Sequence, residues 1–541
     1  MKLKNFIYMG ALLLAATSCE SYLDQPPVNL LSSNGFYQTT AQANQGVLGI
    51  YADLRYAVDQ TYYHLSEVRS DNAWVEPEPN GQRDYSDIGT FRAGSELITA
   101  ESAWNMWYKV IYDANVAIQK ISAATYDNAT VQAQLLNEAH FLRGYAYFEL
   151  CRIFGNVPMV VEPSSPSVVN GMAQTDAQTV INEVVIPDLK EALNLPDRGK
   201  VTNGVGTAVP DQGRADKTAA AAMLARVYMT LAGFPYNDAS ATAQAKTYLQ
   251  QVLAKKSDYW APDITEWRKQ WTPDYNNKYS VFAIQYRTGG TGNPGIFNIV
   301  KSLPPSYTNG VGVRLFGNDI FVEKTLRFEF ARVYSGGNKD LRGEGWSLLD
   351  GYAAEANTVA YPTTYEDVTV DGETLNIATN SMFYKPLPSK PKMDELGLTM
   401  DYSALKDYYD WPCNFPVIRI EDMMLLNAEI MCAEGNVSGA IGVVNEIRQR
   451  AGCDAVSASS ADEALKLVKR ERRLELMGEG VRWFDEVRYG SWKQDILDMF
   501  ARYRNPSGTS TSNVADGRYL YAIPANQMNI TPGLYKQNTG Y

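Results

Sequence analysis

The sequence has 541 residues and carries 61 acidic against 49 basic side chains, so its formal net charge at pH 7 is −12. An acidic chain does not favour nucleic acid or anionic lipid as the main partner, since both attract clustered lysine and arginine. Only two histidines, His64 and His140, are present, which leaves little material for a histidine-based triad or a multi-histidine metal site. Neutral ligands fit this composition better.

The N-terminus has the order of an export signal. Two lysines precede a mostly apolar run over residues 6–16, and this run is too short to span a bilayer, which takes ~20 residues. Three small residues at 16–18 then lead into Cys19, which is similar to the lipobox of bacterial lipoproteins. We therefore expect residues 1–18 to be a signal peptide and Cys19 to be acylated, with no transmembrane helix in the rest of the chain.

Helical periodicity dominates residues 36–255. Apolar residues recur at helix spacing in six segments separated by short polar breaks. In the second of these, Trp104, Tyr108 and Ile111 fall on one stripe, and in the fifth a run of alanines at 219–222 lets a neighbouring helix approach closely. The expected helices are 38–57, 101–123, 131–152, 176–194, 213–232 and 240–254.

The composition changes at about residue 256. From there to residue 412, Gly, Pro, Asn and aromatic residues replace the helical pattern, and 279–286 is the best candidate for a strand. Loops of this length in a compact protein are uncommon unless they serve a function. We therefore expect 256–412 to be a functional, loop-rich region with short strands.

Helical periodicity resumes at about 420–434, 438–451 and 461–478. The first two of these segments meet at Gly435, with Ala428 before the turn and Ala440 after it. Small residues there let two antiparallel helices pack closely, which resembles a tetratricopeptide (TPR) hairpin. The expected fold is mainly α, with TPR-like helix pairs forming a right-handed helical scaffold and an inserted loop-rich region containing short strands. In a single domain, 19–541, the scaffold is 36–255 and 413–490, and the insertion is 256–412.

The remaining cysteines give no sign of a metal centre. Cys151, Cys413, Cys432 and Cys453 include no CxxC pair, so we predict no zinc or iron–sulfur site and no other cofactor. Cys151 and Cys432 fall in expected helices, where a buried free thiol is the simplest interpretation. Disulfides stay open as an alternative in an exported chain.

A charge-dense segment at 469–488 raises the question of catalysis. Glu475 and Glu479 are about one helical turn apart, a spacing that the acid and base of a glycosidase could use. Helix-spaced ion pairs, Arg472 with Glu475 among them, favour a structural role instead. No phosphate loop or nucleophile elbow is present, so we expect no enzyme.

Eight segments, in a fixed order, resemble one protein family over nearly the whole chain. They begin with CESYLD at Cys19, WNMWYKVIYDAN at Trp104, FLRGYAYFELCRIFGNVPMV at Phe141 and ADKTAAAAMLARVYMTLAG at Ala215. They continue with PVIRIEDMMLLNAEIMCAEG at Pro416, VNEIRQRAG at Val444, RERRLELMGEGVRWFDEVRYG at Arg470 and the tail YAIPANQMNITPGLYKQNTGY. Their order and spacing are similar to the SusD/RagB family of Bacteroidetes nutrient-binding outer-membrane lipoproteins.

The resemblance implies a non-catalytic lipoprotein, anchored at the surface of the outer membrane through Cys19. Such a protein captures oligosaccharides and delivers them to a SusC-like TonB-dependent transporter, with the TPR-like pairs facing the transporter and region 256–412 completing the ligand site. The RagB branch of the family implies peptide capture as an alternative. An exported glycoside hydrolase is an alternative from a different class, and it predicts product release that depends on one carboxylate.

Sugar-binding surfaces need flat aromatic rings beside rigid hydrogen-bonding groups, because sugars present faces of C–H groups edged by hydroxyls. The proline-interrupted segment 70–85 offers such a set: Asp71, Asn72, Trp74, Arg83 and Tyr85. A tryptophan in a polar loop must pack on something. For Trp74 a ligand and the neighbouring helices are equally good partners.

Two further groups of candidate ligand contacts lie outside this loop. By resemblance, the family's contacts extend to the start of the following helix, where Asn105 falls off the apolar stripe and Trp107 lies at its edge. In the insertion, an aromatic arc is suggested by rings that sit among Gly, Asn and Asp: Tyr334, Trp346, Tyr352, Tyr361 and Tyr365. Tyr334 and Trp346 are the leading candidates in this region.

Overall fold

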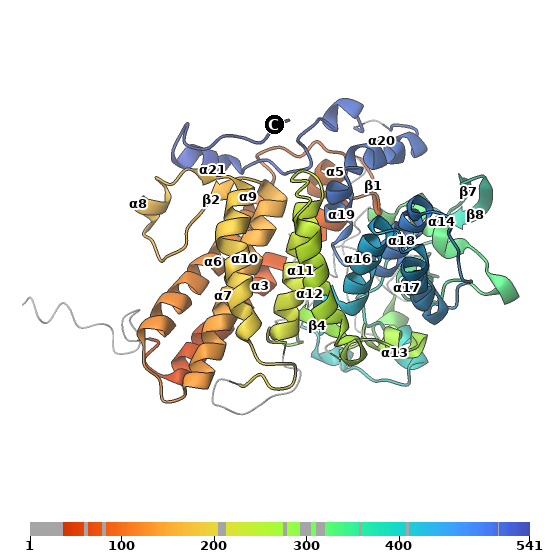
Figure 1. The fold of residues 1–541 in the computed structure, drawn as a ribbon. Coiled ribbons are helices and arrows are strands. Elements are labelled where there is room, and N and C mark those ends of the chain that lie inside the picture. The colour runs from red at the N-terminus through yellow and green to blue at the C-terminus, as the bar shows by residue number, and fades with distance from the viewer. Residues whose placement is uncertain are drawn as a thin grey trace, which may run out of the picture.

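The computed structural model describes residues 36–58, 63–77, 83–203, 213–273, 278–290, 292, 304–309, 320–355, 360–406, 410–506 and 508–541. The expected signal peptide and Cys19 lie outside these residues, as does the side chain of Arg83. In the described part helices dominate, and the strands are short and paired two by two (Figure 1). The mainly helical fold is therefore confirmed.

Helices packed side by side form a frame. Its members are α3 (Thr40–Val58), α6 (Ile98–Ala123), α7 (Ala129–Phe154), α10 (Ile186–Glu191), α11 (Lys217–Ala232), α12 (Ala241–Leu253), α16 (Ile420–Ala433), α17 (Val437–Arg450) and α18 (Ala461–Leu476). Consecutive helices contact one another as pairs, α6 with α7, α11 with α12, and α16 with α17. Figure 1 shows them in a row, with α6 and α7 at the left, α11 in the middle and α16 to α18 at the right.

The frame helices lie within a few residues of the expected ones. Where the sequence predicts one helix over 176–194, the chain forms α9 (Ala177–Val180), a π-helical turn (Ile181–Val185), α10 and a 3-10 turn (Ala192–Asn194) in succession. Side chains cap several starts: Asn128 accepts a hydrogen bond from the Val131 amide at 3.1 Å, and Asp216 accepts one from the Ala219 amide at 2.8 Å. These caps satisfy donors that a helix leaves unpaired at its first turn.

The turn between α16 and α17 shows why small residues stand there. Gly435 has φ +75°, a left-handed conformation that glycine adopts without steric cost. Asn436 caps α17 by accepting a hydrogen bond from the Gly439 amide at 3.0 Å. Ala428 and Ala440 are both fully buried, so the two helices meet closely, as the TPR-like pattern predicts.

The insertion, 256–412, consists of short elements joined by loops. They are α13 (Ile264–Lys269), β4 (Ser280–Ile284), β5 (Ile320–Val322), α14 (Lys324–Ala331), β6 (Leu348–Leu349), β7 (Tyr365–Val370), β8 (Glu373–Ala378), β9 (Met382–Phe383) and α15 (Lys390–Glu395). β4 confirms the strand expected at 279–286. It pairs antiparallel with β10 (Phe415–Arg419) of the frame, so β4 is attached to the frame directly before α16.

A buried cluster of charges joins the insertion to the frame. Glu475 of α18 accepts hydrogen bonds from Arg419 at 2.9 Å and from Arg342 of the insertion at 2.8 Å. Lys385 of the insertion contacts Glu479 at 2.5 Å. All five of these residues are less than 5% exposed, so each buried charge has an opposite charge beside it inside the protein.

Other segments close the ends of the frame. α5 (Arg83–Gly89) and β1 (Ala73–Val75) precede α6, and α19 (Arg482–Tyr489) and α20 (Trp492–Arg502) follow α18. The C-terminal segment with α21 (Ala525–Ile530) then crosses the same end of the frame as α8 (Pro166–Val169) and β2 (Val157–Pro158), as Figure 1 shows at the upper left. β2 pairs with β3 (Gln174–Thr175).

The four cysteines after Cys19 are free and buried, which confirms the interpretation of Cys151 and Cys432 as buried thiols. Within the described residues, no helix is both long and apolar enough to pass through a bilayer.

Candidate functional site

The polar residues of the loop before α5 are held inside the protein. Asp71 is 7% exposed, and its carboxylate accepts hydrogen bonds from Arg482 at 2.7 and 2.9 Å. Burial opposes ionisation of Asp71, but the guanidinium groups of Arg473 and Arg482 hold its pKa well below the ordinary value. The Asn72 side chain donates to Glu67 at 2.7 Å and accepts from Arg473 at 2.9 Å. Both residues are therefore occupied by protein partners rather than exposed to a ligand.

The aromatic residues of this loop are buried as well. Trp74 lies in β1 and is 4% exposed, and its ring stacks on Tyr503 with centroids 3.7 Å apart. Tyr85 is 7% exposed and stacks on His64 at 4.3 Å. Of the two partners that the sequence leaves open for Trp74, the protein core is the one found. These rings shape the inner side of the surface and do not face solvent.

Two candidate ligand contacts outside the loop are also buried. Trp107 of α6 is fully buried against Tyr145, because the apolar stripe of α6 is wide enough to include it. Trp346 is 2% exposed and donates its ring N–H to Glu395 at 3.0 Å. Tyr334 is half-buried, with the guanidinium of Arg448 5.4 Å from its ring centroid.

Three tyrosines of the insertion gather into an aromatic arc. The ring centroids of Tyr307 and Tyr352 are 6.2 Å apart, and those of Tyr352 and Tyr361 are 5.7 Å apart. All three rings are half-buried. The buried ring of Tyr384 lies against Tyr307, with the two ring centroids 6.2 Å apart. This set, Tyr307, Tyr352 and Tyr361, is called the tyrosine arc.

Backbone and carboxylate contacts fix the arc. Tyr352 and Tyr361 exchange two backbone hydrogen bonds of 3.0 Å, and the Tyr361 hydroxyl donates to the Asn380 carbonyl at 2.8 Å. Glu355 accepts from the backbone amide and the hydroxyl of Ser306, next to Tyr307. Burial raises the pKa of Tyr352 to about 12, with a contribution from Tyr307. The arc therefore offers fixed rings with hydroxyl groups beside them.

Asn105 belongs to a different part of the molecule. It is exposed on α6 and lines a pocket of about 620 Å³ between α6, residues 158–170 and the C-terminal segment. Trp104 and Tyr108, predicted as scaffold residues, form part of its wall, with ring centroids 5.1 Å apart. Tyr112 and Tyr535 supply two more rings. This cavity is called the α6 pocket.

The sequence interpretation missed Tyr307, Tyr112 and Tyr535. A signal for Tyr112 was present, since it lies beside the apolar stripe of α6 and an exposed aromatic residue on the polar side of a helix is unusual. Tyr307 follows two prolines, Pro304 and Pro305, in a segment without periodicity. Tyr535 reaches the pocket only through the path of the tail, which no local pattern indicates.

The carboxylates considered for catalysis are structural. Besides Arg419 and Arg342, Glu475 accepts a hydrogen bond from the Trp267 ring N–H at 2.9 Å. The predicted pair of Arg472 with Glu475 is wrong: Arg472 contacts Asp422 at 2.6 Å and Asp485 at 2.7 Å. No group of His, Cys, Asp and Glu suited to a metal ion occurs within the described residues.

Two family models match separate parts of the chain. The model described as "SusD family" matches residues 318–541, and the model described as "Starch-binding associating with outer membrane" matches residues 21–229. SusD-like protein P38 of Formosa agariphila is 25% identical over 515 residues, which is 90% of this chain and 92% of that protein. SusD-like protein P25 of the same organism is 23% identical and aligns over the full length of both chains.

Solved structures share the fold at low identity. A SusD homologue from Bacteroides thetaiotaomicron has a TM-score of 0.74 at 20% identity, covering 94% of this chain and 98% of that one. A laminarin-binding SusD-like protein has a TM-score of 0.68 at 22% identity, covering 93% and 99%. Surface glycan-binding protein A from Bacteroides fluxus has a TM-score of 0.69 at 21% identity, with the same coverage. The chain belongs to the SusD family.

Proposed function

We propose that this protein is a non-catalytic cell-surface protein that binds oligosaccharides through the tyrosine arc and passes them to a SusC-like TonB-dependent transporter. Membership of the SusD family supports the class of function, and two of the structural neighbours are named as a laminarin-binding and a glycan-binding protein. The observation that carries the proposal is the arc itself, three half-buried rings side by side in the insertion.

The chemistry of the arc suits a sugar. Rings that are tilted by 54° and 36° to their neighbours form a curved surface, and the faces of successive pyranose units can stack on such a surface. The carboxylate of Glu355 and the hydroxyl of Ser306 stand beside the rings, where acceptors and donors are needed for sugar hydroxyls. Because the rings are fixed by backbone pairing, little side-chain entropy is lost when a ligand binds.

The membrane part of the proposal rests on sequence. Cleavage before Cys19 and acylation of that cysteine would hold the protein at the outer membrane, as the family model's description also suggests. The frame helices would then face the transporter. Replacing Cys19 by Ala is expected to release the protein from the membrane fraction, and continued membrane association of that variant would contradict lipid anchoring.

The binding proposal is tested with the arc. We expect Tyr307→Ala and Tyr352→Ala each to weaken binding of the polysaccharide ligand by about 5-fold, since one stacked ring contributes ~1 kcal/mol and about 1.4 kcal/mol corresponds to a factor of ten. Affinity electrophoresis against plant, algal and host polysaccharides identifies the ligand first, and isothermal titration calorimetry with the matching oligosaccharide then measures the loss.

Tyr365→Ala is the matched control. Tyr365 also lies in the insertion, but its ring is 63% exposed on β7 and outside the arc. Its removal is expected to leave binding unchanged. Equal losses in all three variants, or no binding of any polysaccharide by the wild-type chain, would reject the arc as a sugar site, and release of shorter products from the ligand would reject the non-catalytic assignment.

A further inference from the structure

We propose that the α6 pocket is a second binding site, separate from the tyrosine arc, which holds one or two rings of an uncharged oligosaccharide. The inference rests on the proposed glycan-binding function, and it adds a site and a charge selectivity that the arc does not provide. Its volume of about 620 Å³ lies in the range of small-molecule sites.

The walls of the pocket are held in place without a ligand. The Tyr108 hydroxyl donates to the Pro158 carbonyl at 2.8 Å, and the Asn115 amide donates to the Val160 carbonyl at 2.9 Å. On the other side, the Thr531 hydroxyl donates to the Asn170 carbonyl at 2.7 Å and ties the C-terminal segment to the end of α8. A preformed pocket loses little free energy to ordering when it binds.

Every residue that lines the pocket is uncharged. The charged residues nearby on α6 have partners outside it: Glu101 accepts from Asn526 at 2.5 Å, and Lys109 lies between Asp53 and Asp113. An acidic sugar entering the pocket would therefore lose water without gaining a counter-charge, and the acidic chain as a whole would repel it. The pocket favours a neutral ligand.

Rings and amides in the pocket are arranged as a sugar requires. Tyr112 is 49% exposed at the rim, while Trp104 is only 3% exposed and forms the floor. Gln527 donates to Asn105 Oδ1 at 3.4 Å. Among the described residues, Asn105 Nδ2 and the side-chain amide of Asn170 have no hydrogen-bond partner, so they are available to sugar hydroxyls.

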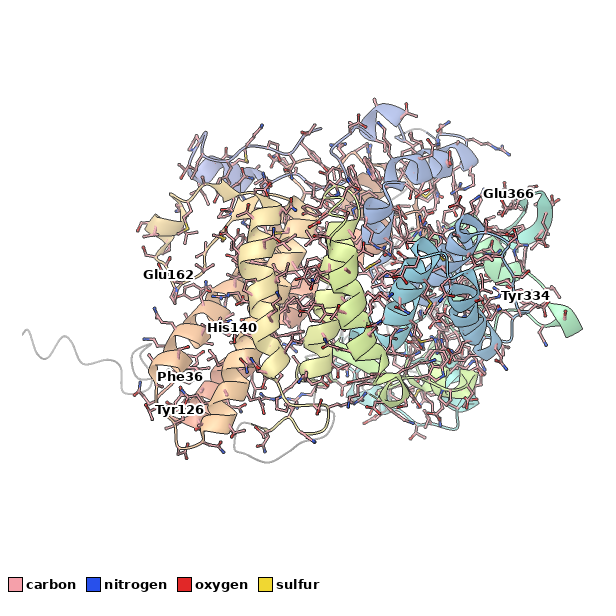
Figure 2. All side chains as sticks on the ribbon, viewed as in Figure 1. Phe36, Tyr126, His140, Glu162, Tyr334 and Glu366 are labelled. Carbon is pink, nitrogen blue, oxygen red and sulfur yellow. The ribbon has the colours of Figure 1, made fainter. Side chains whose placement is uncertain are left out.

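The pocket and the tyrosine arc are built from different segments. The pocket uses α6, residues 158–170 and the C-terminal segment, and the arc uses residues 307–361 of the insertion. In Figure 2, Glu162, which lies within the 158–170 segment of the pocket, is at the left, whereas Tyr334 and Glu366 of the insertion lie at the far right. A substitution in one site can therefore be made without touching the other.

The experiment is calorimetric titration of the full chain with laminarihexaose, maltohexaose, xylohexaose and, as an acidic probe, hexagalacturonate. We expect a neutral hexasaccharide to occupy two sites on the wild-type chain. Tyr112→Ala and Asn105→Ala are each expected to weaken one of them by about 5-fold, the loss that corresponds to ~1 kcal/mol for one stacked ring or one hydrogen bond. Tyr307→Ala should weaken only the other, and hexagalacturonate binding should not respond to Tyr112→Ala.

Tyr56→Ala is the matched control for the pocket, because Tyr56 is a similarly exposed tyrosine, 55%, on another frame helix, α3. It should leave both sites intact. One site only, lost in Tyr307→Ala and unaffected by Tyr112→Ala and Asn105→Ala, would overturn the second site and leave the proposed function standing. Loss of hexagalacturonate binding in Tyr112→Ala would overturn the neutral selectivity. No binding of any probe would count against both proposals.

A peptide is the other ligand chemistry that a pocket with rings and amides admits. Titration with the uncharged capped tripeptide acetyl-Gly-Phe-Gly-amide separates the two. Tripeptide binding that disappears in Tyr112→Ala, together with the absence of a second site for the neutral hexasaccharides, would assign the pocket to peptides and overturn the inference.

Discussion

The helical frame and the insertion are stabilised in different ways. In the frame, long helices bury whole apolar faces, and α7 is buried on nearly every side. In the insertion, two-stranded ribbons and single helical turns cover less apolar surface, and β7 is largely exposed. Among its described residues, the insertion has only small apolar clusters of its own, around Trp267 and Phe328, so its contacts with the frame add to its stability.

The buried charges supply much of that contact. Arg342 and Lys385 come from the insertion, whereas Glu475 comes from α18 and Glu479 from the turn that follows it. Trp267 of α13 adds a hydrogen bond to Glu475. The base of the insertion is therefore fixed to the frame, while the tyrosine arc lies nearer the surface. A rigid base under half-buried rings is a suitable arrangement for a binding surface.

The largest expected effect comes from breaking this joint. Glu475→Gln removes one negative charge that faces Arg342, Arg419 and Arg450, at 2.8, 2.9 and 2.9 Å. Leaving buried guanidinium groups without a counter-charge is expected to lower the free energy of unfolding by roughly 3–5 kcal/mol. Denaturant-induced unfolding followed by circular dichroism measures the change.

Glu434→Gln is the matched control, because Glu434 pairs with Lys246 at the surface, where both side chains are well exposed. That pair should contribute less than about 1 kcal/mol. A loss of similar size in the two variants would contradict the view that the insertion depends on its buried charges.

The frame could be predicted from the sequence because helices leave a periodic pattern. The stripe of Trp104, Tyr108 and Ile111 and the alanine run of α11 depend only on residues close in the chain. The burial of Trp74 could not be predicted in the same way, because its partner, Tyr503, lies in another part of the sequence. For the same reason the true partners of Arg472 were missed.

The candidate site was predicted less well than the fold. Tyr352 and Tyr361 were indicated by their glycine- and asparagine-rich surroundings, and they do lie side by side. Trp346 has similar neighbours in the sequence but is buried against Trp267 and its cluster. Composition shows that a ring is in an irregular segment, but whether that ring faces solvent depends on tertiary packing.

A second joint between the regions depends on pH. Asp216 caps α11, and Tyr259 of the insertion donates to it at 3.3 Å. Burial raises the pKa of Asp216 from 3.8 to about 6. The folded protein then binds more protons than the unfolded chain between those pH values, so the stability contributed by protonated Asp216 is present below pH 4 and is lost as the pH rises through 6.

Asp216→Asn isolates this titration, since asparagine is as good a helix cap as aspartate but does not ionise. Relative to the variant, the free energy of unfolding of the wild-type chain is expected to fall by at most about 3 kcal/mol between pH 4 and pH 7.5. Unfolding curves of both proteins at several pH values give the difference. The prediction is contradicted if this difference in the free energy of unfolding does not change with pH, or if the wild-type chain becomes more stable than the variant as the pH rises. Ionisation of Asp216 would then not destabilise the folded protein.

The smallest expected effects on stability come from substituting one glycine in each region. Gly49 lies on the exposed side of α3, and no atom is within 4 Å of the position that a Cβ would take. Gly49→Ala is expected to stabilise the protein by about 0.5–1 kcal/mol, because alanine loses less backbone entropy than glycine in a helix. Gly372 lies in the two-residue turn between β7 and β8 and has φ +82°. Gly372→Ala has equally open space but is expected to destabilise the hairpin by about 1 kcal/mol, because that turn needs a positive φ.

The effect of each substitution on stability is measured from the midpoint of denaturant-induced unfolding, provided that the dependence of the unfolding free energy on denaturant concentration is unchanged. The opposite signs follow from the difference between a periodic helix and a strained turn, and not from lost contacts, because neither glycine is packed against other atoms. If the β7–β8 hairpin unfolds together with the rest of the domain, Gly372→Ala should lower the unfolding midpoint by its full effect. A midpoint that stays unchanged in Gly372→Ala while Gly49→Ala raises it would show that the β7–β8 hairpin opens independently of the frame. The dependence of the insertion on the frame would then be limited to its charged base.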